Sequence, residues 1–205
     1  MRNKLLIILI LLIGLCTLNS CKNKKGQEEV SNMDSNQVCI ELTDGRKINL
    51  ELYPDVAPIS VANFLKLVDA KFYDGIVFHR VIDGFMIQTG GYYMSEDGRT
   101  IMQKEPQATI KGEFSSNGVE NNIEHVAGVL SMARANDPNS GSSQFFICSD
   151  DSPHLDGSYA AFGRVMDDAS LQVVKEIASA STVYVDATLA NFPYPVITIK
   201  TIKRI

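Results

Sequence analysis

Apolar and polar residues follow two different periods along the chain, and the change of period predicts its elements. Residues 38–42 and 47–52 partly alternate between apolar and polar, and an Asp-Gly pair between them predicts a β-hairpin. In residues 58–70, apolar side chains recur at three- and four-residue steps after an initial proline, which predicts an amphipathic helix. A second helix is expected over residues 171–178. Further strands are expected at residues 76–81, 86–88, 128–133, 144–148, 160–165 and 195–202.

The number and length of these elements favour a mainly β fold. Many short strands, long glycine-rich connections and only two helices are typical of a closed antiparallel β-barrel. The 205 residues suffice for one ordinary domain and are too few for two comfortable ones. The sequence therefore predicts one domain over residues 38–205, preceded by segments of a different character.

The N-terminus has the pattern of an export signal. A basic start is followed by an apolar run of 11 residues, Leu5–Leu15. At about 1.5 Å per residue this run cannot cross a hydrocarbon core roughly 30 Å thick, so residues 1–20 are predicted to be a secretory signal peptide. The sequence Leu-Asn-Ser-Cys, which ends at Cys21, resembles the lipobox of bacterial lipoproteins, in which the Cys becomes the first residue and carries acyl chains. The alternative is an ordinary signal peptide with an incidental Cys.

The segment that follows is predicted to be a tether. Residues 21–37 contain several charged side chains and no aromatic residue, so they cannot bury enough surface to fold alone. As a flexible chain they would hold the domain roughly 20–24 Å from a membrane. Acylation of Cys21 would anchor the protein to a membrane of the bacterial cell envelope.

Composition excludes several classes of site. The net charge of −5 argues against a nucleic-acid partner, because a phosphate backbone is held mainly by clustered Lys and Arg. The three His residues form no HExxH motif or close His/Cys cluster, so no metal is expected, and no phosphate-cradling glycine loop or other sign of a cofactor site is present. Cys39 and Cys148 lie in strand-like apolar contexts. An exported location would permit a disulfide, but two buried free thiols are the favoured interpretation.

One stretch of the chain combines a cation, an amide and large apolar residues. Arg80 and Gln88 flank Phe85 and Met86, and a charged Arg in a strand is not cheaply buried. A second Gln-plus-aromatic stretch follows at residues 142–147. These residues predict an apolar pocket with one fixed cation and several amide donors. The alternatives are that Arg80 belongs to a surface ion pair and that the apolar residues are plain core.

Ordered motifs at matching spacing identify a resemblance. Over residues 38–202 the chain closely resembles the cyclophilin family of peptidyl-prolyl cis–trans isomerases. The motifs that carry it are Pro58…Asn63-Phe64, Tyr73-Asp74-Gly75, Phe78-His79-Arg80-Val81-Ile82, Gly84-Phe85-Met86-Ile87-Gln88, Leu130-Ser131-Met132-Ala133, Ser143-Gln144-Phe145-Phe146-Ile147, Leu155-Asp156-Gly157 and Phe162-Gly163-Arg164-Val165.

The resemblance implies a fold and a set of site residues. The fold would be a closed eight-stranded antiparallel barrel capped by two helices. Arg80 would be the catalytic arginine, and Gln88 and Gln144 would hold the substrate backbone and orient Arg80. The other substrate-binding positions would be Phe85, Met86, Phe146 and Leu155 in the proline pocket, Ala133 and the Arg134 backbone along the groove, and His154 and Tyr159 at the rim.

Three positions depart from the family pattern. His154 stands where many cyclophilins have a Trp, which should weaken cyclosporin binding. Tyr159 takes the place of a familiar His and keeps an aromatic body with a polar tip. Thr89 separates Gln88 from the Gly-Gly pair that begins at Gly90, so the loop beyond can be shifted.

The sequence thus predicts a monomeric, membrane-anchored isomerase that acts on proline-containing polypeptides during the folding of exported proteins. Rotation about a peptide bond needs no imidazole protonation, so His79 is interpreted as structural, and His125 receives no role. Two rival functions stay open. One is a non-catalytic module that binds proline peptides, and the other is a chaperone that acts independently of proline.

Overall fold

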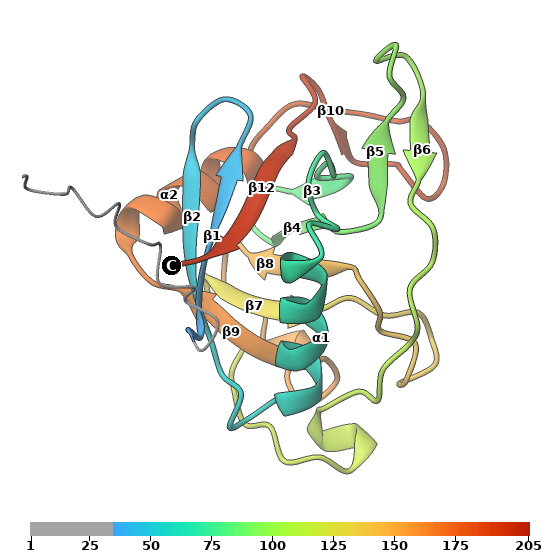
Figure 1. Cartoon of the computed structure of the whole chain (residues 1–205). Coiled ribbons are helices and arrows are strands. Elements are labelled where there is room, and N and C mark those ends of the chain that lie inside the picture. The colour runs from blue at the N-terminus through green and yellow to red at the C-terminus, as the bar shows by residue number, and fades with distance from the viewer. Residues whose placement is uncertain (1–34) are drawn as a thin grey trace, which may run out of the picture. The chain divides into compact units, whose positions relative to one another are not determined.

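The computed structural model describes residues 35–205, and one curled sheet dominates them (Figure 1). Its strands, in chain order, are β1 (Gln37–Leu42), β2 (Lys47–Leu52), β3 (Arg80–Ile82), β4 (Met86–Thr89), β7 (Val129–Met132), β8 (Phe145–Cys148), β9 (Ala161–Val165) and β12 (Ile199–Arg204). Their spatial order is β12-β1-β2-β9-β7-β8-β4-β3, and every neighbouring pair is antiparallel. The predicted signal peptide, Cys21 and most of the predicted tether lie outside the described residues.

The predicted hairpin is the pair β1–β2. Ile40 lies opposite Ile48 and Val38 opposite Leu50, and all four side chains are buried. Gly45 adopts a φ of 90° in the turn, a left-handed conformation that glycine reaches without steric cost. The Asp-Gly pair therefore sets the turn, and the alternation sets which face of the hairpin reaches the core.

The prediction of a closed barrel is wrong. The sheet is open, with β3 and β12 as its two end strands. Residues just before these strands are joined by an isolated bridge between Val77 and Thr198 and by a few neighbouring backbone hydrogen bonds. The Val77 N–H donates to Tyr92 at 2.8 Å, whereas the Phe78 N–H donates to Ile197 at 3.0 Å. Because this segment divides its hydrogen bonds between two partners, no continuous ladder closes the sheet.

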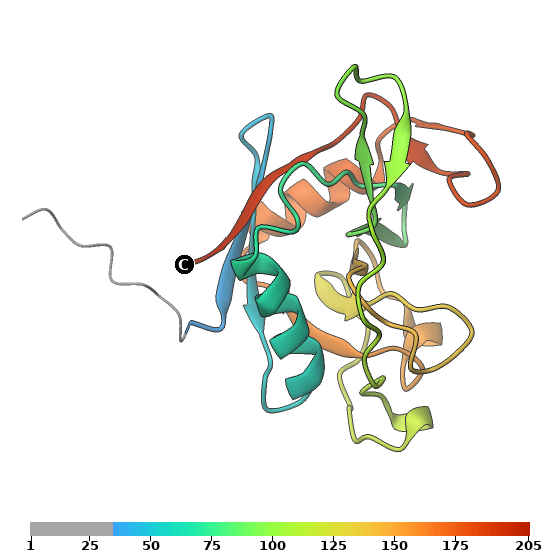
Figure 2. The same cartoon turned by 45° about the vertical axis from the view of Figure 1, so that its right-hand side comes forward.

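Two helices pack on the sheet at separate places (Figure 2). Helix α1 (Pro58–Asp69) matches the predicted helix and buries Phe64, whose ring centroid lies 5.3 Å from that of Phe145. Helix α2 (Asp168–Ala178) begins earlier than predicted, because the Asp167 side chain accepts a hydrogen bond of 2.7 Å from the Ser170 N–H. This cap satisfies a backbone donor that a helix start leaves unpaired.

The backbone N–H groups at the start of α1 donate hydrogen bonds to a side chain from a distant loop. Ala57 precedes the helix and has no side chain that can cap it. Instead, the carboxylate of Glu113 accepts hydrogen bonds from the N–H groups of Ile59 at 2.9 Å and Ser60 at 2.7 Å. These hydrogen bonds place the negative charge of the buried Glu113 at the positive end of the helix dipole.

Four short strands outside the main sheet were not predicted. They form the hairpin of β5 (Tyr92–Met94) with β6 (Ile101–Gln103) and the pair of β10 (Thr182–Val183) with β11 (Phe192–Pro193). A separate apolar cluster lies beneath them, around Val77, Leu189 and Phe192. Within residues 35–205 there are also two short 3-10 helices, η1 (Ser115–Asn117) and η2 (Pro153–Leu155). Cys39 and Cys148 are buried and unpaired, as predicted.

Candidate active site

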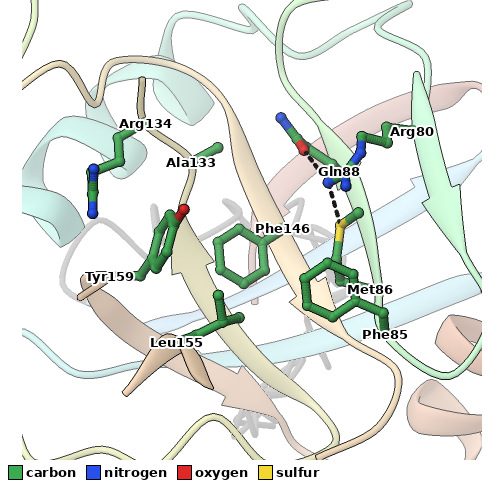
Figure 3. Close-up of a pocket in the computed structure, with 9 residues that line it drawn as sticks. All are labelled: Arg80, Phe85, Met86, Gln88, Ala133, Arg134, Phe146, Leu155 and Tyr159. Carbon is green, nitrogen blue, oxygen red and sulfur yellow. Dashed lines mark hydrogen bonds between the residues drawn. The ribbon is translucent and has the colours of Figure 1, made fainter. Parts of the chain in front are cut away.

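A cavity of about 140 Å³ opens on the outer face of the sheet (Figure 3). Its lining comes from β4 and β8, from the first residue of β3 and from the segments that follow β7 and surround η2. Nine residues line it, and all of them were predicted as site residues from the sequence: Arg80, Phe85, Met86, Gln88, Ala133, Arg134, Phe146, Leu155 and Tyr159.

The strand register explains why these residues meet. Arg80 lies opposite Gln88, Gln88 opposite Phe146, and Phe146 opposite Ser131. These four residues therefore form one row across β3, β4, β8 and β7, and side chains in such a row share one face of the sheet.

The neighbouring row faces the other way. Val81, Ile87, Ile147 and Leu130 pair in the same fashion and are buried in the main core. Because side chains alternate between the two faces of a strand, the burial of this row directs the row of Arg80 outward.

Arg80 has neutral neighbours. Its Nη1 lies 3.5 Å from Gln88 Oε1 and 3.9 Å from Met86 Sδ, and its guanidinium carbon lies 5.9 Å from the centre of the Phe85 ring. No carboxylate within residues 35–205 forms an ion pair with Arg80. Burial lowers the pKa of the guanidinium, an effect that Tyr159 partly offsets, yet the group stays charged at neutral pH. The charge is thus available to a bound molecule.

The side-chain amides of Gln88 and Gln144 form a chain of contacts that ends at Arg80. Gln88 Nε2 donates a hydrogen bond of 3.0 Å to Gln144 Oε1, which leaves Gln88 Oε1 directed to Arg80. Gln144 does not line the main cavity. It lines an adjacent hollow of about 300 Å³, shared with Gln88, Ala133 and Arg134.

The cavity floor is apolar. Met86, Phe146 and Leu155 are buried together with Cys148, and Phe85, Ala133 and Tyr159 pack against them. Figure 3 shows Phe146 between the side of the cavity that carries Arg80 and the side that carries Tyr159. A small nonpolar ring placed on this floor would lie beside the guanidinium.

Arg134 contributes its side chain, although the sequence predicted only a backbone role. The guanidinium carbon lies 4.6 Å from the ring centre of Tyr159 and 5.2 Å from that of Phe114. Its Nε and Nη2 donate hydrogen bonds of 3.1 and 3.0 Å to the carbonyl of Ser158. Arg134 therefore connects three loops and supports the cavity wall formed by Tyr159.

The predicted rim residue His154 is exposed and lies outside the lining set. Its ring centroid is 5.3 Å from that of Phe85. Thr89, the additional residue before the Gly-Gly pair, extends β4 and donates a hydrogen bond of 2.9 Å to the carbonyl of Val77. At Gly91 a Cβ atom would come within 2.5 Å of the Gln144 amide nitrogen, so glycine lets the backbone pass close to the amide chain.

The sequence missed a buried imidazole, His125, that packs against the cavity floor. His125 Nδ1 lies 2.9 Å from Asp156 Oδ1, and its Nε2 lies 3.1 Å from Ser131 Oγ. The imidazole stacks on Phe146 with ring centroids 6.1 Å apart and planes 19° apart. Ser131 and Asp156 lie in two motifs that were already recognised, but their meeting with His125 depends on tertiary structure.

His79 is also buried but lies away from the cavity. Its ring centroid is 4.7 Å from that of Tyr92. Within the described part of the chain, no group of three or more His, Cys, Asp or Glu side chains is arranged to hold a metal ion.

Comparison with known proteins places the chain in a family. Residues 37–204 match the family described as cyclophilin type peptidyl-prolyl cis-trans isomerase/CLD. A peptidyl-prolyl cis-trans isomerase of Synechococcus elongatus is 42% identical over 141 residues, which cover 69% of this chain and 88% of the relative. Peptidyl-prolyl cis-trans isomerase B of Bacillus subtilis is 47% identical over 124 residues, which cover 60% of this chain and 79% of the relative.

Solved structures extend the similarity to the fold. A cyclophilin-type isomerase of Cryptosporidium parvum, crystallised in the presence of the dipeptide Ala-Pro, has a TM-score of 0.62 and 29% sequence identity. The match covers 82% of this chain and 98% of that one. With the row of Arg80, Gln88 and Phe146 in place on such a sheet, the chain belongs to the cyclophilin-type peptidyl-prolyl cis–trans isomerases.

Proposed function

We propose that this protein accelerates rotation about Xaa-Pro peptide bonds, with Arg80 as the catalytic residue. The observation that carries the proposal is the guanidinium of Arg80, which lies at the edge of an apolar cavity without a carboxylate partner in residues 35–205. A paired arginine would have to break its ion pair before it could act on a substrate. Within the described part of the chain, the contacts that Arg80 would have to give up are weak ones to neutral groups.

The reaction requires neither a nucleophile nor an acid. Rotation about the amide C–N bond breaks its resonance, against a barrier of about 18–20 kcal/mol. In the twisted state the proline nitrogen regains its lone pair and can accept a hydrogen bond, which a planar amide nitrogen does not. A donor aimed at this nitrogen therefore stabilises the transition state more than the ground state, and this difference lowers the barrier.

The cavity floor supplies the second requirement, which is a grip on the ring. Met86, Phe146 and Leu155 offer an apolar surface on which a pyrrolidine ring can rest. Because this floor excludes water, the local dielectric constant is lower, and the electrostatic effect of Arg80 is stronger. Gln88 and Ala133 border both the cavity and the adjacent hollow, so an extended peptide could continue from one to the other.

The direct test compares Arg80→Ala with wild type in exchange of a proline peptide, followed by NMR. We expect the variant to lose about 100- to 1000-fold in rate, the usual cost of removing one preorganised donor. Arg164→Ala is the matched control, because Arg164 is an exposed arginine of β9 outside the cavity. Binding of the peptide by wild type without acceleration of exchange would support a non-catalytic module instead. Suppression of aggregation that is equal in wild type and Arg80→Ala, without isomerase activity, would support a chaperone.

We also propose that the protein is exported, lipidated at Cys21 and monomeric, and that its substrates are exported polypeptides. The support comes from residues 1–21, in which a basic start is followed by an apolar run and then by the sequence Leu-Asn-Ser-Cys. No helix within residues 35–205 is long and apolar enough to span a bilayer. Mass spectrometry of the protein from membranes should show a mature N-terminus at Cys21 that carries acyl chains. A protein with residues 1–20 still attached would refute lipidation, and sedimentation of the purified protein would test the monomer.

A further inference from the structure

A line of three polar side chains runs from the surface to the cavity floor, because Asp156 is exposed whereas His125 and Ser131 are buried. Asp156 Oδ1 accepts a hydrogen bond of 2.7 Å from the backbone N–H of His125 and lies 2.9 Å from its Nδ1. On the other side of the ring, Nε2 lies 3.1 Å from the hydroxyl of Ser131. His125 is 1% exposed and Ser131 is 0% exposed.

The order of acid, imidazole and hydroxyl resembles the arrangement that activates a nucleophile, but the burial of Ser131 excludes that role. Its side chain has no exposed surface, and it does not line the cavity. A substrate carbonyl cannot approach a hydroxyl that neither solvent nor the cavity reaches. Asp156, His125 and Ser131 therefore have a role other than covalent catalysis.

Its contacts point to the cavity floor. The His125 ring stacks on Phe146, and Ser131 lies directly opposite Phe146 in the register of β7 and β8. Asp156 follows Leu155, the other floor residue, in the turn after η2. The three polar side chains thus connect the surroundings of Phe146 with the turn that carries Leu155, and both of these residues form the cavity floor.

The hydrogen bonds also determine which nitrogen of His125 carries the proton. Asp156 accepts at Nδ1, so Nδ1 is the donor and Nε2 accepts from the Ser131 hydroxyl. Burial lowers the pKa of His125 below its ordinary value, and the contacts with Asp156 offset this lowering only in part. The neutral ring is therefore favoured at pH 7. For Asp156, burial acts to raise the pKa, but the hydrogen bonds from His125 outweigh it and bring the pKa below its usual value.

We propose that His125 is a positioning residue, which fixes the Phe146 ring and the Leu155 turn and so determines how tightly the site holds the proline ring. The proposal rests on the proposed isomerase function. A floor contacts the proline ring in the ground state and in the transition state alike, and such uniform binding appears in KM rather than in kcat. His125 should therefore act on KM, in contrast to Arg80.

The experiment uses His125→Phe and Ser131→Ala in the full chain. His125→Phe keeps a flat ring against Phe146 but removes both hydrogen bonds. We expect KM for a proline peptide to rise about tenfold in each variant, with kcat changed less than about twofold. The double variant should resemble the single ones, because both remove the same line. The matched control is Ser170→Ala, which removes another buried serine hydroxyl. That hydroxyl accepts from the Asn49 N–H, and neither residue lines the cavity.

Two readouts separate this proposal from the proposed function. Phe146 resonances in NMR spectra of isotopically labelled protein should shift in both variants and stay unchanged in Ser170→Ala. The Kd for the peptide, measured by titration, should rise in parallel with KM. If wild type binds the peptide but does not accelerate exchange, the proposed function fails while the NMR shifts and Kd still test His125. Unchanged Phe146 resonances and an unchanged Kd would overturn the proposal, as would a loss confined to kcat.

Discussion

Arg80 and Gln88 are eight residues apart in the chain but directly opposite each other in the sheet. Phe146 continues the same row on the next strand. The site is thus built across the strands, and each strand needs to supply only one or two side chains. A substitution that slipped the register of β4 by one residue would turn Gln88 into the core and Ile87 toward the substrate.

At the same scale, we predict that Arg134→Lys raises KM several-fold and leaves kcat nearly unchanged. Lysine keeps the charge but has no planar group to stack between Tyr159 and Phe114, and it cannot donate to the Ser158 carbonyl from two nitrogens at once. The cavity wall formed by Tyr159 would then loosen. Steady-state kinetics on a proline peptide checks this, with Arg164→Lys as the control. An unchanged KM would show that Tyr159 holds its place without Arg134.

Much of this site could be predicted from the sequence because its residues occur in short contiguous motifs. Arg80, Gln88 and the floor residues each belong to such a motif, and nine predicted residues do line the cavity. His125 and the side chain of Arg134 were missed for a common reason. His125 meets Asp156 from 31 positions away, and Arg134 meets Ser158 from 24 positions away, so neither contact has a local pattern.

Among the elements, α1 shows how a helix can depend on a residue outside it. Its periodicity and its initial proline were enough to predict the helix. The partner of its N-terminus, Glu113, comes from a loop 53 positions further along the chain than Ser60 and could not be read from the local sequence. The open sheet has a related origin, because residues 76–79 have the composition of a strand but divide their hydrogen bonds between two neighbours.

We expect Glu113→Gln to lower the free energy of unfolding by about 1–2 kcal/mol. Glutamine keeps one acceptor for the N–H groups of Ile59 and Ser60 but removes the negative charge at the helix start. Urea unfolding at pH 7 measures the change, and Glu96→Gln, at an exposed position, serves as the control. Equal midpoints for Glu113→Gln and wild type would show that the carboxylate charge does not stabilise α1.

For the whole molecule, the buried His79 links stability to pH. Burial lowers the pKa of His79 to about 4, whereas an unfolded chain would protonate this ring near its ordinary value of 6.5. Between these two values the unfolded state binds more protons than the folded state. Stability therefore falls as the pH falls from about 6.5 to about 4.

We predict that His79 accounts for a loss of about 3 kcal/mol in the free energy of unfolding over this range. Urea unfolding of wild type and His79→Phe at several pH values between 7 and 4 measures it. The variant should lack this part of the pH dependence, although it keeps the contributions of carboxylates such as Asp44 and Asp69, whose pKa values are lowered by Arg46 and Arg204. Parallel curves for the two proteins would contradict the prediction.

Arg80 has no ion-pair partner in the described residues, and this also has a thermodynamic consequence. A partly buried guanidinium with neutral neighbours loses hydration without the compensation of a counter-charge, so the folded protein is less stable with it than with an apolar side chain of similar length. Arg80→Leu should therefore raise the melting temperature while it lowers the rate of isomerisation as strongly as Arg80→Ala does. Calorimetry that finds an unchanged or lower melting temperature would contradict this prediction. A trade-off between stability and activity would then operate at a single position of the chain, and selection for a more stable protein alone would remove the arginine.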